Sequence, residues 1–234
     1  MQHETIYKKN YKSKKDFPSL SKNIDCDIVV VGAGLAGLVL SHELGKKNVD
    51  VVLIEANRIG DGASGMNGGF CSPGWSSSQS KLIKKYGQRV AQNFNELSVE
   101  GLKWVKSFEG EKGFESFKPK LGTLNLSLLK SENSGNQLFK EELRHLKSFE
   151  FISKSELQDF VFSKAYNYGI LSTEGFHFNP LEFLNALKIR VHEKSVRIFE
   201  NTQMTKFLEN SSNCHVDVSS GYRINCKKLV LAGG

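Results

Sequence analysis

The chain has 234 residues, a formal net charge of +7 and the composition of an ordinary globular protein, so it can bury a core in one large or two small domains. The apolar run Ile28 to Leu40 is too short for a membrane span, and the N-terminus lacks the apolar segment of a secretory signal. These features exclude a bilayer-spanning or signal-led class and predict a cytoplasmic location.

Residues 1–24 carry much of the positive charge. They hold six lysines against only two acids, Glu4 and Asp16. This balance predicts a basic, solvated and partly disordered N-terminal arm. An arm that binds nucleic acid or a membrane surface is the alternative, but few aromatic residues are interleaved with the lysines. We therefore expect no nucleic-acid partner.

The next stretch predicts a strand–turn–helix–strand unit. The apolar run Ile28–Val31 enters a glycine cluster, and a helical pattern covers residues 35–46. We expect Gly45 to end that helix. A second β-branched run, Val49–Ile54, follows and ends on Glu55.

The glycines of this unit have the spacing of a dinucleotide-binding turn. Gly32 permits a tight turn, Gly34 lets the backbone approach a pyrophosphate, and Gly37 lets the helix pack against the strand. The helix N-terminus offers free N–H groups to phosphates. Glu55 can accept hydrogen bonds from ribose hydroxyls and would repel a 2′-phosphate. The unit therefore indicates NAD or FAD.

Residues 56–80 form a long segment rich in glycine and serine. Its length and composition exceed those of an ordinary connection. Gly60, Gly62 and Gly65 allow close approach of the backbone to a ligand. Because the segment follows Glu55 directly, we interpret it as facing the ligand; a flexible surface loop is the alternative. Arg58 is expected near the adenosine or a phosphate, or simply at the surface.

Periodicity predicts the remaining elements. Helices are expected over 81–108, as one long amphipathic helix with a core stripe, over 131–147 and 153–160, and from Pro180 onward with Asn179 as the cap. The expected strands are 121–129, 169–174, 196–199, 204–208, 214–218, 222–225 and 229–234. The last is expected to be buried. Since the chain stops directly after it, we interpret the sequence as part of a longer protein.

The four cysteines do not form a metal-binding pattern. None has C-x-x-C spacing or lies beside a pair of histidines with metal-ligand spacing. We expect free thiols in a reducing compartment and no metal site, with the cysteines at Cys26, Cys71, Cys214 and Cys226.

Three motifs together resemble a known family. The G-A-G-L-A-G-L turn, the acid Glu55 and the sequence R-I-G-D-G-A-S-G-M-N-G-G at 58–69 resemble the FAD-dependent amine and amino-acid oxidases, which include D-amino-acid, glycine and sarcosine oxidases. The γ-glutamylputrescine oxidase branch is most similar, because its hallmark is G-A-S-G-R-N-G-G after the acid. The E-N-T sequence at 200–202 and the ending K-K-L-V-L-A-G-G are also similar to that branch.

The resemblance implies an α/β fold: a Rossmann-like FAD-binding domain with a three-layer ββα arrangement and an α+β substrate domain. The FAD-binding domain would be discontinuous, over 25–80 and 165–234. Residues 81–164 would be an insertion that contributes to the substrate domain. The residues implied to bind FAD are Gly32, Ala33, Gly34, Leu35, Ala36, Gly37, Glu55, Ala56, Arg58, Gly62, Ala63, Ser64, Asn67, Gly68, Gly69, Met204, Ala232 and Gly233.

The chain departs from the family pattern at Met66, where the family usually has arginine. This removes a positive charge from the expected cofactor loop. No catalytic side chain is indicated; His177 is a candidate, but a packed or surface histidine is the simpler interpretation.

The activity implied by the resemblance is oxidation of the C–N bond of a primary or secondary amine or an amino acid. Hydride would pass to the flavin, the imine would hydrolyse, and oxygen or another acceptor would reoxidise the flavin. The alternatives are an NAD-dependent dehydrogenase, a tRNA-modifying flavoprotein, and a non-catalytic FAD-domain fragment.

Overall fold

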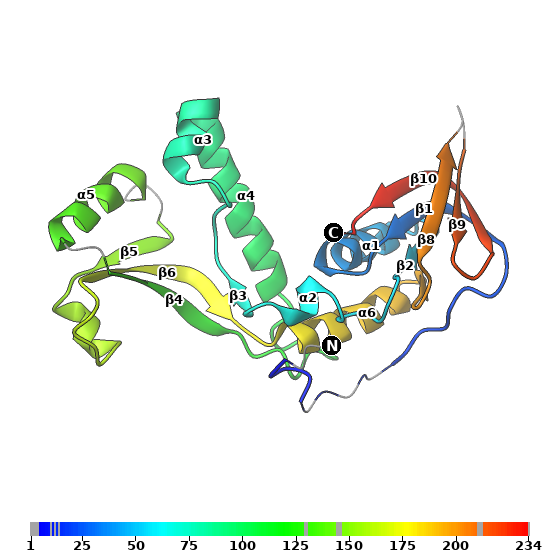
Figure 1. Ribbon diagram of the computed structural model, residues 1–234, viewed down its shortest axis with the longest axis horizontal. Helices are drawn as coiled ribbons and strands as arrows, with labels where there is room; N and C mark the ends of the chain where they lie inside the picture. The colour runs from blue at the N-terminus through cyan, green and yellow to red at the C-terminus, as the bar shows by residue number, and fades with distance from the viewer. Residues whose placement is uncertain are drawn as a thin grey trace. The chain divides into compact units, whose positions relative to one another are not determined.

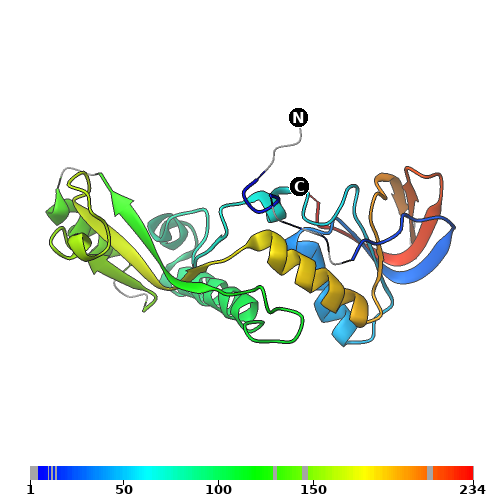
Figure 2. The same ribbon diagram turned by 90° about the horizontal axis from the view of Figure 1, so that it is seen from below.

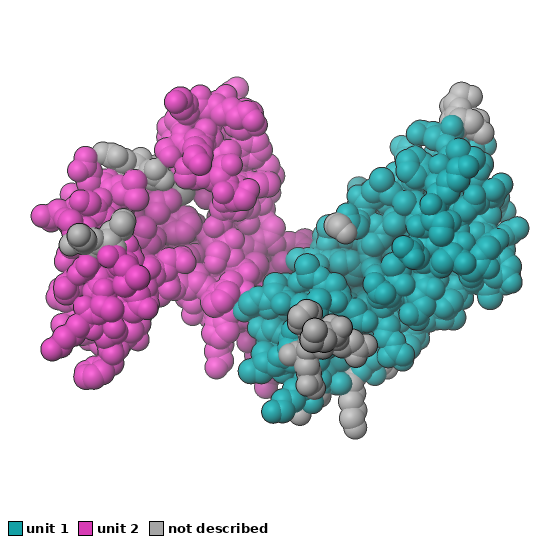
Figure 3. Space-filling model, viewed as in Figure 1, with its two compact units in different colours: residues 1–68, 111–116, 179–234 teal, residues 69–110, 117–178 magenta. Residues whose placement is uncertain are grey.

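The computed structural model describes residues 5–9, 11, 13, 15–128, 131–143, 147–209 and 213–233. Its chain forms two compact units, coloured separately in Figure 3. The first unit comprises residues 1–68, 111–116 and 179–234, and the second comprises 69–110 and 117–178. How these units correspond to the expected FAD-binding and substrate domains stays a prediction.

The first unit contains a six-stranded sheet in the order β7-β2-β1-β10-β9-β8. Strands β7, β2, β1 and β10 run parallel, whereas β9 and β8 continue the sheet in antiparallel pairs. Figure 1 labels all of these strands except β7. The strands are β1 (Ile24–Val31), β2 (Val51–Ile54), β7 (Arg197–Phe199), β8 (Met204–Glu209), β9 (Cys214–Val218) and β10 (Arg223–Leu231). The helices of this unit are α1 (Leu35–Lys46), α2 (Ala63–Met66) and α6 (Pro180–Glu193).

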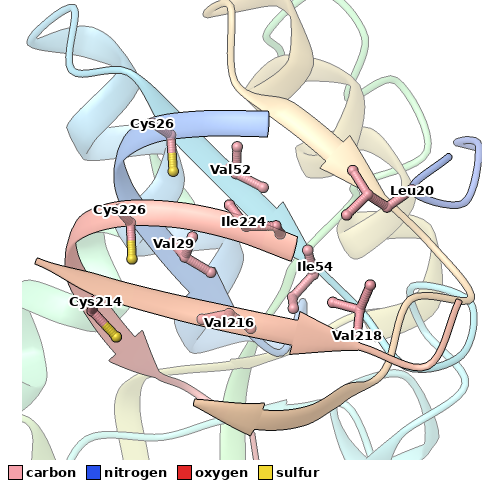
Figure 4. Close-up of a cluster of buried hydrophobic side chains, with 10 residues drawn as sticks. All are labelled: Leu20, Cys26, Val29, Val52, Ile54, Cys214, Val216, Val218, Ile224 and Cys226. Atoms are coloured by element: carbon pink, nitrogen blue, oxygen red, sulfur yellow. The ribbon is translucent and has the colours of Figure 1, made fainter. Parts of the chain in front are cut away.

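Strand β2 and the middle of β1 are buried on both faces of the sheet. Every residue of β2 is inaccessible to solvent. Because successive side chains alternate in direction, one face of the sheet gathers side chains of β1 and β2 with side chains of β9 and β10, which continue the same sheet, into one buried cluster. That cluster includes Val29, Val52, Ile54 and Val216 (Figure 4). Helices α1 and α6 lie side by side on the other face (Figure 2). The predicted α/β fold class is therefore confirmed.

The second unit is built on a four-stranded antiparallel sheet. Strand β6 is central and pairs with β3, β4 and β5. The strands are β3 (Phe70–Cys71), β4 (Lys120–Ser127), β5 (Phe149–Ile152) and β6 (Tyr168–His177). The helices are α3 (Gln79–Tyr86), α4 (Gln88–Lys106), α5 (Glu132–Glu142) and a 3-10 turn, η1 (Glu156–Asp159).

Local sequence signals placed several elements correctly. The helix predicted from residue 35 to 46 is α1, and the strand predicted at 214–218 is β9. Asn179 caps α6 as expected, because its side-chain oxygen accepts hydrogen bonds from the amides of Leu181 and Glu182 at 3.1 and 3.2 Å. The apolar residues at helical spacing in α6 are buried, namely Leu181, Leu184, Leu187 and Val191.

Two predictions about helices were wrong, and in each case the reason lies at a glycine. Gly45 does not end α1; it lies within the helix, where an added Cβ would come within 3.0 Å of Lys194 and Val196. Its role is therefore close packing against the chain that follows α6. The helix predicted over 81–108 is divided into α3 and α4 at Gly87, whose φ of +83° belongs to no right-handed helix. Leu97, whose spacing fits the core stripe expected for this segment, is 56% exposed.

Other differences lie at strand and loop boundaries. The helix expected over 153–160 is only the short turn η1, preceded by the unpredicted strand β5. The glycine-rich segment after Glu55 contains α2 and β3. The two strands expected at 222–225 and 229–234 are one continuous strand, β10, and Leu231 at its end is 58% exposed instead of buried.

The N-terminal arm differs from the prediction of a solvated segment. Phe17 and Leu20 are buried, and Leu20 belongs to the core cluster of the first unit. Lysines 12 and 14, Leu129, residues 144–146 of the helix expected over 131–147, and Gly234 lie outside the described residues. Among the helices described here, none combines the length and apolarity needed to cross a membrane.

Candidate cofactor site

A cavity of about 520 Å³ lies where β1, β2 and β10 of the first unit end. Parallel strands bring their carboxyl ends to one edge of a sheet, which is where ligands bind in folds of this kind. The cavity is lined by Val31, Gly32, Ala33, Gly34, Glu55, Ala56, Asn57, Arg58, Gly60, Gly62, Ala63, Ser64, Gln203, Met204, Ala232 and Gly233.

The turn from β1 to α1 has the geometry that the glycine spacing predicts. Gly32 has a φ of +99°, and an added Cβ would meet the backbone of Ala232 and Gly233 at 2.7 to 2.9 Å. Gly37 is buried, and an added Cβ would collide with the carbonyl oxygen of Gly32. Both positions therefore require glycine, and α1 can begin directly at the cavity with Gly34 as its N-cap.

A second turn of the same construction faces the cavity. Gly60, Gly62 and Gly65 repeat the G-x-G-x-x-G spacing, and Gly60 has a φ of +96°. An added Cβ on Gly65 would collide with the carbonyl oxygen of Gly60, just as an added Cβ on Gly37 would collide with the carbonyl oxygen of Gly32. The short helix α2 starts after Gly62 just as α1 starts after the corresponding glycine of the first turn.

Ser64 connects the two turns. Its Oγ accepts a hydrogen bond from the backbone N–H of Leu35, in the first turn of α1, at 3.0 Å. An added Cβ on Gly34 would lie 2.9 Å from the same oxygen. The serine hydroxyl thus lies at the N-terminal end of α1, where the helix dipole and the unpaired amides favour an anionic group.

Glu55 follows β2 and is fixed by backbone amides. Its Oε2 accepts a hydrogen bond from Ala33 at 2.9 Å, and its Oε1 accepts one from Asn57 at 3.0 Å. Each carboxylate oxygen accepts more than one hydrogen bond, so this arrangement orients the group without using all its accepting capacity. Arg58 is exposed and lines the same cavity.

The structure brings most of the predicted cofactor residues together. Those that line the cavity are Gly32, Ala33, Gly34, Glu55, Ala56, Arg58, Gly62, Ala63, Ser64, Met204, Ala232 and Gly233. The predicted residues outside this lining are Leu35, Ala36, Gly37, Asn67, Gly68 and Gly69. Leu35 and Gly37 act within α1, as described above.

The other residues outside the lining have different local positions. Ala36 is exposed on α1. The side-chain amide of Asn67 donates hydrogen bonds to the carbonyls of Ala63 and Ser64, at 3.3 and 2.9 Å, at the end of α2. Gly68 is exposed at the end of the first unit, and Gly69 begins the second.

Three lining residues carried no expectation from the sequence: Val31, Asn57 and Gln203. Gly60, expected only to let the backbone approach a ligand, also lines the cavity. The signal for Gly60 was present, because its spacing to Gly62 and Gly65 repeats the first glycine turn. Asn57 was detectable only as a neighbour of Glu55 and Arg58. Gln203 carried no signal, since its position depends on the fold of a distant segment.

The chain offers no evident catalytic or metal-binding cluster among its described residues. No group of three or more His, Cys, Asp or Glu side chains in this part of the chain has the geometry to hold a metal ion. His177 is exposed at the end of β6, beside the ring of Phe70. Burial raises the pKa of the Cys71 thiol to about 11, which disfavours the nucleophilic thiolate.

The lining fits the pyrophosphate and ribose of a dinucleotide. Two glycine turns bring backbone to the cavity without side chains, the start of α1 supplies N–H groups, and Glu55 supplies an oriented hydrogen-bond acceptor. An added side chain at Gly32 would push into Ala232 and Gly233, which form part of the cavity wall. None of the residues that line the cavity has chemistry that would exclude a flavin dinucleotide.

Comparison with known proteins agrees with this geometry. Residues 27–234 match the family described as DAO, FAD dependent oxidoreductase. Over 222 residues the chain is 27% identical to the γ-glutamylputrescine oxidoreductase of Escherichia coli, a match that covers 93% of this chain and 51% of that protein. The chain spans about half the length of the curated relatives it matches.

Solved structures with lower sequence identity share the fold. Glycine oxidase from Geobacillus kaustophilus has a TM-score of 0.71 at 18% identity, over 90% of this chain and 55% of that one. L-Amino acid deaminase from Proteus vulgaris has a TM-score of 0.70 at 17% identity, over 96% of this chain and 50% of that one.

Proposed function

Because the chain belongs to the DAO family of FAD-dependent oxidoreductases, we propose that its protein oxidises the C–N bond of a primary or secondary amine or an amino acid. The observation that carries this proposal is the match over 222 residues to a γ-glutamylputrescine oxidoreductase, a protein named for an amine substrate. The shared fold with a glycine oxidase and an L-amino acid deaminase supports the same substrate class.

FAD is the family's cofactor, and when bound it accepts the hydride that leaves the carbon beside the nitrogen. We assign its pyrophosphate to the two glycine turns, around Gly34 and Gly62, and to the N-terminus of α1. Glu55 would accept hydrogen bonds from the adenosine ribose, and Arg58 would flank the adenosine. Met204 would meet the adenine through its backbone, and Ala232 and Gly233 would pass near the dinucleotide.

We assign the residues of this chain the role of binding and orienting the cofactor, and we assign none of them a proton transfer. Backbone amides at the start of α1 would offset part of the phosphate charge. The amides of Ala33 and Asn57 hold the Glu55 carboxylate in one orientation before any ligand arrives. Such pre-orientation reduces the entropy lost on binding. Substrate oxidation itself needs a deprotonated amine more than a dedicated side-chain base.

The absorbance spectrum of the purified intact protein tests the proposal. We expect a bound flavin chromophore that is bleached anaerobically by members of a panel of polyamines, N-alkylated amines and amino acids. Alcohols and 2-hydroxy acids serve as matched substrates without nitrogen. A protein that binds a nicotinamide nucleotide in place of flavin, or a flavin reduced by the hydroxy acids alone, would contradict the proposal.

A matched pair of arginine variants tests the assignment of the adenosine end. Arg58 and Arg89 are both exposed, but only Arg58 lines the cavity. We expect Arg58→Ala to weaken FAD binding about threefold to tenfold, as loss of one contact to a charged group would. Arg89→Ala should leave it unchanged. Equal affinities in the two variants would place the adenosine elsewhere.

A further inference from the structure

Glu200 is a buried carboxylate outside the cavity lining. It follows β7 and is 1% exposed. Its Oε1 accepts a hydrogen bond from the backbone N–H of Ile59 at 2.7 Å, and its Oε2 accepts one from the backbone N–H of Phe17 at 2.8 Å. One side chain therefore holds two backbone segments that lie far apart in sequence.

Lys188 balances the charge of this group. Its Nζ lies 3.7 Å from Glu200 Oε1, and the two side chains are 2% and 1% exposed. The lysine also donates a hydrogen bond to the hydroxyl of Ser13 at 3.1 Å. Burial lowers the pKa of Lys188, and the Glu200 carboxylate acts in the opposite direction. A buried charge without such a partner would be strongly destabilising.

The two residues after Glu200 hold the same loop. The amide of Asn201 donates to the carbonyl of Asn57 at 2.9 Å, and the amide of Thr202 donates to the carbonyl of Glu55 at 2.8 Å. Together with the bond from Ile59, three successive residues fix the chain from 55 to 59. That stretch includes four residues of the cavity lining.

The N-terminal arm is attached at the same point. The amide of Leu20 donates to the hydroxyl of Thr202 at 3.1 Å, while the Phe17 amide binds Glu200. The side chains of Phe17 and Leu20 are 6% and 2% exposed. Further along the arm, Lys8 forms an ion pair with Asp61 at 2.7 Å.

We propose that Glu200 is a positioning residue for FAD, which fixes the loop from Glu55 to Ile59 and couples the N-terminal arm to that loop. The inference rests on the proposed function for the identity of the ligand. The Glu200 carboxylate fixes both segments because it accepts hydrogen bonds from two backbone N–H groups at once. Glutamine has the same shape but only one accepting atom, so it leaves either Ile59 or Phe17 without its partner.

Three variants of the intact protein separate positioning from general stability. Glu200→Gln removes one acceptor and leaves Lys188 without its counter-ion. Lys188→Met removes the ion pair but keeps both amide bonds to Glu200. The double variant places no unpaired charge in the core, yet it still lacks the second acceptor, and it carries the test if Glu200→Gln alone fails to fold.

FAD affinity, measured by titration of flavin fluorescence, is the first measurement. We expect the dissociation constant for FAD to rise at least tenfold in Glu200→Gln and in the double variant. In Lys188→Met it should change less than threefold. This variant should nevertheless unfold at a lower denaturant concentration than the wild-type protein. An affinity that instead follows stability across the three variants would overturn the proposal, as would unchanged affinity in both glutamine variants.

Hydrogen exchange of the ligand-free protein is the second measurement, and it does not depend on flavin. The double variant should exchange faster at residues 15–20 and 56–60 together, whereas Lys188→Met should not. If the wild-type protein bound no FAD, the proposed function would fail while this comparison still decided the role of Glu200. Unchanged exchange in both segments of the double variant would overturn the positioning role.

Discussion

At the scale of single residues, the structure distinguishes glycines that the backbone requires from glycines that only a ligand would require. Gly32→Ala forces an L side chain to a φ of +99° and into the backbone of Gly233 at 2.7 Å. We expect this variant to lose more than about 2 kcal/mol of unfolding free energy. Gly62 has a φ of −88° and nothing within 4 Å of an added Cβ. Gly62→Ala should keep its stability within about 0.5 kcal/mol.

Urea denaturation of both variants, followed by FAD titration, checks this difference. Because Gly62 lines the cavity, its alanine variant should weaken FAD binding even though the fold is unchanged. Equal stability of the two variants would show that the strain at Gly32 is relieved elsewhere. Full affinity in Gly62→Ala would remove the second glycine turn from the cofactor site.

The raised pKa values of two buried cysteines predict how the free energy of unfolding changes at alkaline pH. Burial raises the pKa of Cys26 from 9.0 to about 12 and that of Cys226 to about 11. The unfolded chain then releases these protons near pH 9, whereas the folded protein retains them. The stabilising contribution is therefore complete below pH 9 and is lost as pH rises towards 11 to 12.

The slope of the unfolding free energy between pH 9 and 11 is the measurement. Cys226→Ala should make this decline shallower, whatever its effect on stability at pH 7. Val29→Ala is the matched control, because Val29 belongs to the same buried cluster and does not titrate (Figure 4). It should lower stability but keep the wild-type slope. Equal slopes in all three proteins would contradict the assigned pKa values.

Those site residues that belong to a short motif with a fixed spacing were predictable from the sequence. Gly32, Gly34 and Glu55 follow from spacing alone, because the turn and the strand end fix their positions. Glu200 was noted only as the first residue of the E-N-T sequence, and that sequence did not indicate that its side chain holds the loop beside them. Its contacts join residues 17, 59, 188 and 200, and no local pattern reports a carboxylate shared between distant segments.

At the scale of elements, a helix boundary was predictable where it depends on residues close in sequence and unpredictable where it depends on distant segments. α1 and α6 begin at glycine or asparagine caps that act within a few residues, so their starts are local properties. Gly45 was misjudged because its reason is tertiary: α1 approaches the chain at Lys194 and Val196 too closely for a side chain. A glycine near a helix end thus has two explanations that sequence cannot distinguish.

Gly87 and Gly101 give opposite predictions for helices of the second unit. Gly87, at a φ of +83°, joins α3 to α4, and its replacement by alanine should lower stability by about 1 kcal/mol or more. Gly101 lies inside α4 with nothing within 4 Å of an added Cβ. Gly101→Ala should raise stability by about 0.5–1 kcal/mol. Thermal unfolding followed by circular dichroism measures both changes, and equal signs would contradict the helix break.

At the scale of the whole molecule, the apolar runs and the glycine spacing predicted only the parallel βαβ unit, whereas the α/β fold class was implied by the resemblance to a family. The assignment of residues to an FAD-binding and a substrate domain stays a prediction, since a division into units depends on contacts among segments separated by about a hundred residues. The arm was misjudged for a related reason. Its lysines indicate a solvated segment, but the burial of Phe17 and Leu20 decides its position.

FAD should stabilise the two units unequally, because every residue assigned to the cofactor cavity belongs to the first unit. A ligand that binds only the folded state adds about 2.7 kcal/mol at a concentration of 100 times its dissociation constant. We therefore expect FAD to slow hydrogen exchange most strongly in residues 29–38 and 53–64. ADP, which lacks the flavin, should protect the same segments. Protection by FAD that is absent with ADP would show that the glycine turns do not hold the pyrophosphate.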